Sequence, residues 1–314
     1  MIRPLLPLVA ALAVTAIAVA QTRTPSSAPA LAPGEIVAAA PASDWVKIAP
    51  SDLLVIDLAP DAKSRPRRVV IQLMPPPFSQ GWIGNIRKLA AAHWWDGLSV
   101  NRVQDNYVVQ WGDADAEDKA KARALPTDLR VMDERAYQRE PNHDNFGTVL
   151  KVKGPRDIYA DWASHRNGWA VAGNKKGWAW PVHCYGMVGV GRDLPPSTGS
   201  GAELYTVIGH APRHLDRNIA LVGRVIEGIE HLSSLPRGTG ALGFYETAEE
   251  RTPITSVRLG NEVSALPAYE YLSTESPTFA RYADARANRR DPFFIKPAGG
   301  ADICNIPVPV RRVK

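Results

Sequence analysis

Short runs of branched and aromatic residues, separated by turn-forming residues, recur along the chain from residue 53 onward. Such runs of four to eight residues, bounded by Pro, Asp, Asn or Gly, predict β-strands. The first two runs are close enough in the chain to predict an antiparallel pair, and the last predicts a closing strand. The predicted strands are Leu53–Leu58, Arg68–Met74, Leu98–Val103, Tyr107–Trp111 and Ile254–Leu259.

Helical periodicity replaces this pattern in two places. Between Phe78 and His93 the apolar positions follow a spacing of three and four, which predicts a helix with Ser79 as its N-cap and Gly97 just past its end. The run Ile229–Leu235 predicts a shorter helix, stopped by Pro236. The apolar positions of the first helix are Trp82, Ile83, Ile86, Leu89 and Ala90.

The strand Leu98–Val103 carries an unexpected side chain. Strict alternation places Leu98, Val100 and Arg102 on one face. Arginine is seldom buried without a partner, so Arg102 is either an edge residue facing water or a functional group. The turn Gln104–Asn106, whose Asp and Asn tolerate turn geometry, joins this strand to Tyr107–Trp111.

The N-terminus has the pattern of an export signal. Arg3 precedes the apolar run Leu5–Val19, and Ala18-Val19-Ala20 offers a small-x-small cleavage site, so we expect a signal peptide over 1–20 that is cleaved after Ala20. The run is short for a membrane anchor, so we expect no stable membrane insertion after cleavage. Residues 21–49 are rich in Ala and Pro and predict a flexible tether. We therefore expect a periplasmic or secreted protein.

The charge and composition of the chain argue against nucleic-acid binding. The net charge of +5 is modest for 314 residues, and no basic run interleaved with aromatics suggests nucleic-acid binding. Cys184 and Cys304 are the two cysteines. In an oxidising compartment they either form one disulfide or stay as separate small buried residues.

Two ordered blocks of sequence are similar to the signature of the cyclophilin-type peptidyl-prolyl isomerases. The first is Asp96-Gly97, four residues, Arg102-Val103, a turn, an aromatic residue, and then Gln110-Trp111-Gly112-Asp113. The second comprises Gly186–Arg192 and His214–Gly228. The resemblance implies a mainly β fold: a closed antiparallel eight-stranded barrel capped by two helices.

The resemblance also implies a domain organisation. The cyclophilin-like domain is expected over 50–265, with a long insertion at 114–182, where a typical member has a shorter segment, and a C-terminal extension at 266–314. The insertion carries Trp162, Trp169, Trp178 and Trp180. These tryptophans form either an exposed binding platform or, as we expect, the local core of an ordered insertion.

The activity implied is cis-trans isomerisation of X-Pro bonds, here in proline-containing polypeptides of the cell envelope, with no cofactor and no metal. Arg102 matches the residue that assists amide twisting, and Gln110 matches the residue that orients it. The substrate-binding positions implied are Tyr107, Val108, Gly191, Arg192, Tyr205, Thr206, His214, Leu215 and Ile219.

Several of these positions depart from the family's pattern. Counting back without gaps from Leu215, Thr206 falls on the aromatic that forms the pocket floor, whereas a slip of one residue puts Tyr205 there. His214 stands where the family has Trp or Phe, and Ile219 where many members have His. These departures could weaken proline binding.

Three other functions are compatible with parts of the sequence. A catalytically weakened peptide-binding or chaperone module would keep the barrel and use the tryptophan-rich insertion. His210 and His214 have the spacing of metal ligands on a helix, but Pro212 between them argues for a loop. A serine hydrolase is disfavoured because the chain has no Gly-x-Ser-x-Gly motif.

Overall fold

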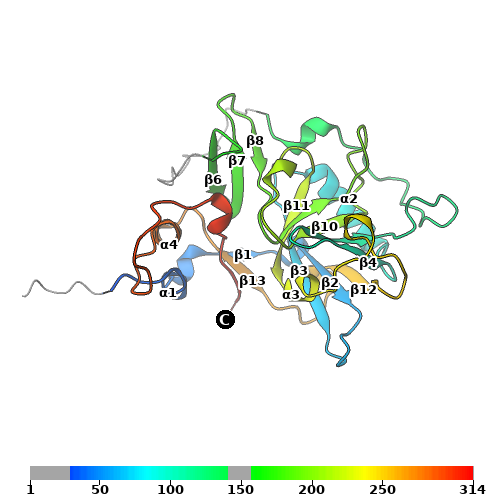
Figure 1. The fold of residues 1–314 in the computed structure, drawn as a ribbon, viewed down its shortest axis with the longest axis horizontal. Coiled ribbons are helices and arrows are strands. Elements are labelled where there is room, and N and C mark those ends of the chain that lie inside the picture. Colours follow the sequence, from blue (N-terminus) through cyan, green and yellow to red (C-terminus); the bar gives the residue numbers. More distant parts are fainter. Residues whose placement is uncertain (1–28, 141–156, 314) are drawn as a thin grey trace, which may run out of the picture.

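A closed antiparallel barrel forms the centre of the protein (Figure 1). The computed structural model describes residues 29–140 and 157–313, so the predicted signal peptide and its cleavage site lie outside the described residues. The eight strands follow one another around the barrel in the order β10-β5-β4-β12-β2-β3-β11-β9, and β9 pairs with β10 to close it. Their bounds are β2 Leu53–Leu58, β3 Arg67–Leu73, β4 Ser99–Val103, β5 Val108–Gly112, β9 Met187–Val190, β10 Leu204–Val207, β11 Leu221–Glu227 and β12 Thr252–Leu259.

This barrel confirms the mainly β fold expected from the sequence. The strands β2 and β3 form the predicted antiparallel pair, and β12 closes the sheet between β2 and β4. The β4–β5 turn contains Asn106 at a φ of 50°, a conformation that asparagine adopts more readily than most residues.

Two helices flank the barrel where they were predicted. Helix α2 (Gln80–Ala91) buries Trp82, Ile86 and Leu89 in the barrel core, whereas α3 (Glu230–Ser233) is a single turn. Ser79 is the N-cap residue of α2, with a φ of 56°, and its side chain makes no capping hydrogen bond. The predicted N-cap position of Ser79 is therefore confirmed, without a side-chain cap.

A second layer packs against one side of the barrel and corrects the predicted tether. Residues 33–48 are ordered as α1 (Pro33–Ala38) and β1 (Trp45–Ile48). Strand β1 pairs with β13 (Tyr269–Leu272), which pairs in turn with β14 (Val310–Arg312). The tether prediction for 21–49 is therefore wrong for residues 33–48. Strand β1 is ordered because it pairs with β13, which lies in the C-terminal extension.

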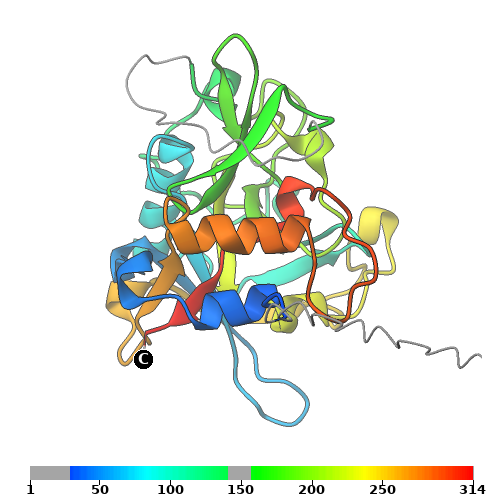
Figure 2. The same ribbon diagram turned by 90° about the vertical axis from the view of Figure 1, so that its left-hand side faces the viewer.

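Helix α4 (Pro277–Ala287) covers this three-stranded sheet and lies alongside α1 (Figure 2). Its Ser276 accepts a hydrogen bond from the backbone N–H of Phe279, a side-chain N-cap. Apolar residues of both chain ends then share one small core, while Tyr269 of β13 packs against Leu53, Val55 and Val70 on the outer face of β2 and β3. The extension is thus a structural layer shared with residues 33–48.

The insertion forms a third small sheet with strands β6 (Trp162–Arg166), β7 (Trp169–Gly173) and β8 (Ala179–Pro181). Trp169 and Trp180 are buried, while Trp162 and Trp178 are half-buried and pack against the same clusters. This confirms the local-core interpretation of the tryptophans. The part of the insertion at 141–156 lies outside the described residues.

A disulfide joins Cys184 to Cys304, with a Cα–Cα distance of 5.1 Å. It links the segment before β9 to the C-terminal extension, so the two cysteines are bonded to each other rather than separately buried.

Within residues 29–140 and 157–313, none of the helices has the length and apolar character needed to span a bilayer. Short 3₁₀ turns complete the described structure: η1 Ala42–Asp44, η2 Pro50–Asp52, η3 Glu134–Tyr137, η4 Arg213–Leu215, η5 Ala241–Gly243, η6 Gly260–Glu262 and η7 Ile303–Asn305.

Candidate active site

A β-bulge in β4 turns Arg102 out of the barrel core. Val100 pairs with Trp111 and Arg102 with Gln110, so Asn101 is an extra residue on the bulged strand. The alternation predicted from sequence is therefore wrong beyond Val100. Val100 and Val103 both face the core, whereas Asn101 and Arg102 both line a cavity on the outside of the barrel.

The guanidinium of Arg102 is held by three acceptors. Its Nε donates to the carbonyl of Leu242 at 2.8 Å, Nη1 donates to Gln110 Oε1 at 3.2 Å, and Nη2 donates to Gln104 Oε1. The rings of Tyr107 and Phe244 flank it, with Cζ 5.9 and 5.1 Å from their centroids. Burial lowers the pKa of Arg102, but an arginine side chain stays ionised in proteins. The result is a positive charge with a fixed orientation.

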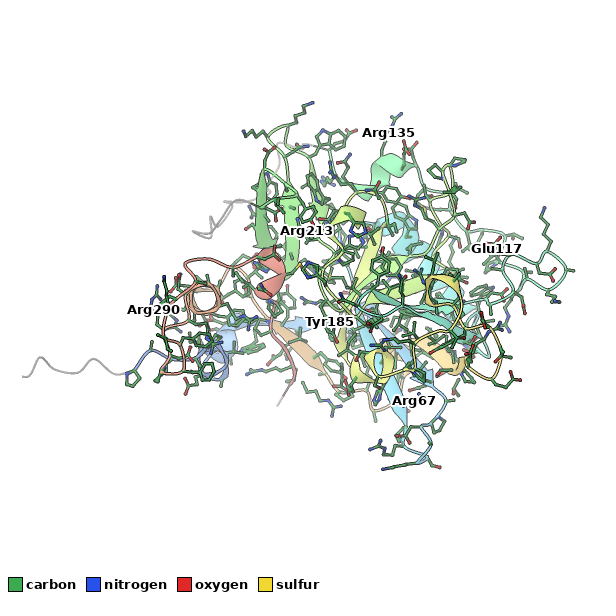
Figure 3. All side chains as sticks on the ribbon, in the orientation of Figure 1. Arg67, Glu117, Arg135, Tyr185, Arg213 and Arg290 are labelled. Atoms are coloured by element: carbon green, nitrogen blue, oxygen red, sulfur yellow. A yellow bond between two sulfur atoms is a disulfide. The ribbon has the colours of Figure 1, made fainter. Side chains whose placement is uncertain are left out.

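The cavity next to Arg102 has a volume of about 770 Å³ and gathers most of the predicted site. Glu117 lies on its rim, at the end of the molecule opposite Arg290 in Figure 3. The predicted residues that line it are Arg102, Tyr107, Val108, Gln110, Gly191, Arg192, Tyr205, Leu215 and Ile219. Val108 and Tyr205 form an apolar cluster with Tyr107 and Ile219 packed against it, which gives the cavity an apolar wall beside the arginine.

Two of the predicted substrate-binding residues lie elsewhere. Thr206 is fully buried and its hydroxyl donates to the carbonyl of Met187, so it faces away from the cavity. Tyr205, the alternative one residue earlier, lines the cavity instead. His214 does not line it either; its ring is exposed and stacks on Tyr107, with centroids 6.2 Å apart. The structure thus places Thr206 outside the cavity, and His214 adjoins the cavity only through Tyr107.

Several lining residues were missed by the sequence reasoning. Leu242 and Phe244 belong to the segment around η5, which approaches Arg102 from a distant part of the chain through a single antiparallel bridge. The glycine-rich stretch 238–243 carries no local signal that it approaches Arg102. Asn101 was missed because the bulge cannot be inferred from alternation, and Glu203 has no counterpart in the motif.

Glu203 is a carboxyl group that lines this cavity and whose pKa is shifted by its surroundings. Its Oε1 accepts the backbone N–H of Asp113 at 2.6 Å, and its carboxylate packs against Gly112, where a Cβ would meet Oε1 at 2.0 Å. Burial raises the pKa of Glu203 from 4.5 to about 7, and the nearby Asp113 adds to this rise. The cavity therefore holds a carboxyl group that changes charge near neutral pH.

This pKa predicts a pH dependence of stability. An acid whose pKa is higher in the folded chain stabilises the folded state while it is protonated. The contribution of Glu203 to the free energy of unfolding is therefore complete below about pH 4.5, and it is lost as the pH rises through about 7. Compared with Glu203→Gln in urea unfolding, the wild type should lose free energy of unfolding over this interval. A constant difference between the two proteins from pH 4.5 to 7 would contradict the assignment.

His210 and His214 do not form a metal site with other described residues. Among residues 29–140 and 157–313 there is no cluster of three or more His, Cys, Asp or Glu side chains arranged to hold an ion. His214 lies in the 3₁₀ turn η4, and its ring stacks on the ring of Tyr107. The spacing of the two histidines therefore reflects a loop.

Comparisons with known proteins identify one matching family and several similar solved structures. The family described as cyclophilin type peptidyl-prolyl cis-trans isomerase/CLD matches residues 79–259. The crystal structure of cyclophilin AquaCyp293 from Hirschia baltica matches with a TM-score of 0.62 at 19% identity, over 86% of this chain and 94% of that one. A cyclophilin type isomerase of Cryptosporidium parvum, solved in the presence of the dipeptide Ala-Pro, matches with a TM-score of 0.37 at 9% identity, over 65% of this chain and 98% of that one. No curated protein matches the sequence.

Proposed function

The chain belongs to the family of cyclophilin-type peptidyl-prolyl cis-trans isomerases, and from this premise we propose that it isomerises X-Pro bonds of exported proteins with the assistance of Arg102. The observation that carries the proposal is the position of the guanidinium. It lies at the edge of an apolar pocket, bonded to Gln110. No covalent intermediate is needed.

The chemical task is rotation about an amide bond. Resonance between the amide nitrogen and the carbonyl creates a barrier of about 18–20 kcal/mol. In the twisted state the nitrogen lone pair is localised and can accept a hydrogen bond. A donor aimed at that nitrogen therefore stabilises the transition state more than either planar isomer, which is what accelerates the reaction.

Arg102 is suited to supply this donor. Its bonds to Leu242, Gln110 and Gln104 occupy three of the five N–H groups of an arginine, so each terminal nitrogen keeps one N–H for a substrate. The same bonds fix the plane of the guanidinium before substrate arrives. An already oriented charge does not have to reorganise during the reaction, and this lowers the barrier further.

The remaining cavity residues fit the other parts of an X-Pro peptide. The apolar cluster of Val108 and Tyr205, with Tyr107 and Ile219, is the proposed site for the proline ring. Gly191 and Arg192 lie at the cavity's edge, where the backbone preceding proline would pass. The Gly191 amide is bonded to the carbonyl of Glu203, so this edge is fixed in place.

The first test is substrate preference. In a protease-coupled assay with peptides of the form Ala-Xaa-Pro-Phe, the protein should accelerate isomerisation without added metal or cofactor. Equal rates with and without the protein, across several residues at Xaa, would overturn the proposal.

Phe244 should contribute to this activity through its contact with Arg102. Removing a cation–π contact costs about 1 kcal/mol, so Phe244→Ala should lower kcat/KM by about fivefold. Phe293→Ala is the matched control, because Phe293 is also exposed but lies in the C-terminal extension. Equal kcat/KM values for the two variants would exclude a role for Phe244.

Export is the second part of the proposal. The N-terminal pattern of Arg3, an apolar run and Ala18-Val19-Ala20 supports it, and so does the Cys184–Cys304 disulfide, since such bonds persist in oxidising compartments. The proposed clients are proline-containing polypeptides of the cell envelope. Protein recovered from the periplasmic or extracellular fraction should begin at Gln21, and an intact Met1 in that fraction would contradict cleavage after Ala20.

A further inference from the structure

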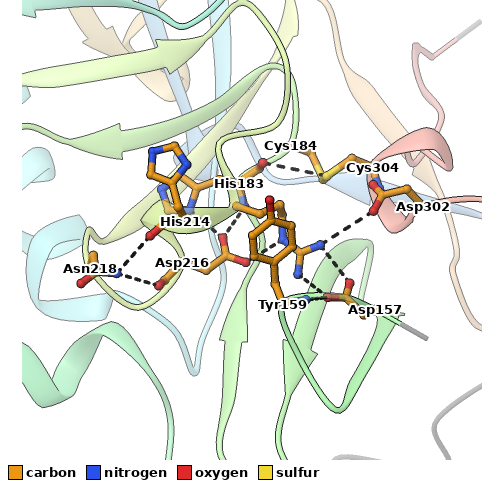
Figure 4. A network of polar contacts seen from close by, with 10 residues as sticks. Asp157, Tyr159, His183, Cys184, His214, Asp216, Asn218, Asp302 and Cys304 are labelled. Carbon is orange, nitrogen blue, oxygen red and sulfur yellow. Dashed lines mark hydrogen bonds and ion pairs between the residues drawn. A yellow bond between two sulfur atoms is a disulfide. The ribbon is translucent and has the colours of Figure 1, made fainter. Parts of the chain in front are cut away.

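The buried polar network around His183 and Asp216 (Figure 4) is hydrogen-bonded to Tyr205, which lines the proposed proline pocket. The ring of Tyr205 lines the cavity, but its hydroxyl is hydrogen-bonded to His183 Nε2 at 2.9 Å. The two rings are nearly parallel, with centroids 6.4 Å apart and an interplanar angle of 10°. The ring of Tyr205 passes over Gly189 of the neighbouring strand, where a Cβ would meet it at 2.3 Å. His183 therefore holds the hydroxyl of Tyr205, and Gly189 leaves room for its ring.

His183 is itself held in one orientation. Its side chain is fully buried, and its Nδ1 lies 2.9 Å from Asp216 Oδ1, which also accepts the backbone N–H of His183 at 3.0 Å. A carboxylate can only accept from Nδ1, so Nδ1 carries the proton and Nε2 is left as an acceptor. The Tyr205 hydroxyl therefore donates to Nε2. Burial lowers the pKa of His183, which keeps this neutral form.

Asp216 is anchored in turn by Arg213. The Nε of Arg213 donates to Asp216 Oδ2 at 2.7 Å, and its two terminal nitrogens donate to Asp157 at 2.9 and 3.1 Å. All three of these charged side chains are almost completely buried. In Figure 3, Arg213 lies between the barrel and the C-terminal extension, and Asp302 of that extension approaches it at 4.0 Å.

The network and the pocket share a chain segment. Leu215, which lines the cavity, lies between Arg213 and Asp216 in sequence. Buried ionic networks are weak stabilisers of a fold, because the cost of removing charges from water offsets their attraction. An apolar floor needs none of these partners. The network is better explained by the orientation that it gives to Tyr205.

We propose that His183 and Asp216 are positioning residues that hold the Tyr205 ring as the floor of the proline pocket, and so set the affinity for proline. This inference rests on the proposed function in that the pocket is taken to bind proline. It concerns residues that never touch the substrate and act only through the Tyr205 hydroxyl.

A double-mutant cycle tests this proposal on the mature, oxidised protein. The variants are His183→Leu, Tyr205→Phe and the combination of both. The control is His165→Leu, which removes another buried histidine, bonded to the carbonyl of Ile306 and remote from the cavity. For each protein, the Kd of the peptide Ala-Ala-Pro-Phe is measured by NMR titration, with Ala-Ala-Ala-Phe as the peptide control, and kcat and KM are measured separately.

His183→Leu should weaken peptide binding by about tenfold, because the Tyr205 hydroxyl loses its acceptor and the ring is no longer held in the orientation of the pocket floor. It should raise KM by the same factor and leave kcat within about twofold. Adding Tyr205→Phe should leave Kd within about threefold of the value for His183→Leu, since both substitutions remove the same hydrogen bond and their effects should not add. His165→Leu should not alter Kd.

Three results would overturn the proposal. These are a wild-type Kd in His183→Leu, fold-losses of the two single substitutions that multiply in the double variant, or an equal loss in His165→Leu. If His183→Leu does not fold, Tyr205→Phe provides the measurement, because it keeps the ring and removes only the hydroxyl that bonds His183 Nε2. This variant should weaken peptide binding. A wild-type Kd in Tyr205→Phe would contradict the role of the network. A wild type that binds the peptide without accelerating its isomerisation would refute the proposed catalysis, while the cycle of Kd values would still decide the role of His183.

Discussion

Arg102→Ala is expected to lower kcat/KM for X-Pro peptides by about 10²- to 10³-fold, the usual loss when one oriented donor to a transition state is removed. The substitution removes the charge and every N–H that could reach the prolyl nitrogen. The apolar wall of Val108 and Tyr205 does not depend on Arg102, so peptide binding should persist. The loss should therefore fall mainly on kcat, measured by the protease-coupled assay.

Two further variants separate charge from geometry. Arg102→Lys keeps a positive charge but not the planar fork that bonds Leu242, Gln110 and Gln104 together, so it should recover only a small part of the activity. Arg65→Ala removes an exposed arginine at the tip of the β2–β3 hairpin, paired with Asp61, and should leave kcat/KM unchanged. A value for Arg102→Ala within threefold of wild type would refute the role assigned to Arg102.

Loss of the Cys184–Cys304 disulfide is expected to reduce the free energy of unfolding by about 4–5 kcal/mol. The bond spans 120 residues of sequence, and on the chain-entropy model a loop of this length strongly restricts the unfolded state. Urea unfolding of Cys184→Ser should show this decrease relative to the oxidised wild type.

The reductant provides the control for this prediction. Cys304→Ser and the reduced wild type should match Cys184→Ser, and adding reductant to either variant should cause no further change. A decrease below about 1 kcal/mol would contradict the chain-entropy argument for this bond.

Much of the barrel could be predicted from sequence because its signals are local. Strand runs such as Leu53–Leu58 have the composition of buried strands, and α2 carries its own 3.6-residue periodicity. The two motif blocks then supplied the topology. By contrast, β1 has only four residues, and its partner β13 lies near the other end of the chain. A segment whose stability depends on so distant a partner looks like a tether in isolation.

The site was predictable in its composition but not in its geometry. The motif identified Arg102 and Gln110, yet alternation gave Arg102 the wrong face, because one inserted residue in β4 reverses the pattern. A shift of one residue similarly separates Tyr205 in the cavity from Thr206 in the core. Phe244 approaches Arg102 only through folding, so no local signal marks it as part of the site.

The most direct test of the central claim is NMR exchange spectroscopy on one peptide, Ala-Ala-Pro-Phe, with wild type and Arg102→Ala. Exchange spectroscopy observes the rotation of the amide itself, and the same spectra report binding through chemical-shift changes. If Arg102 stabilises the twisted amide, both proteins shift the peptide resonances, and only the wild type accelerates cis-trans exchange. Undiminished exchange with Arg102→Ala, or no exchange with the wild type despite binding, would contradict this account.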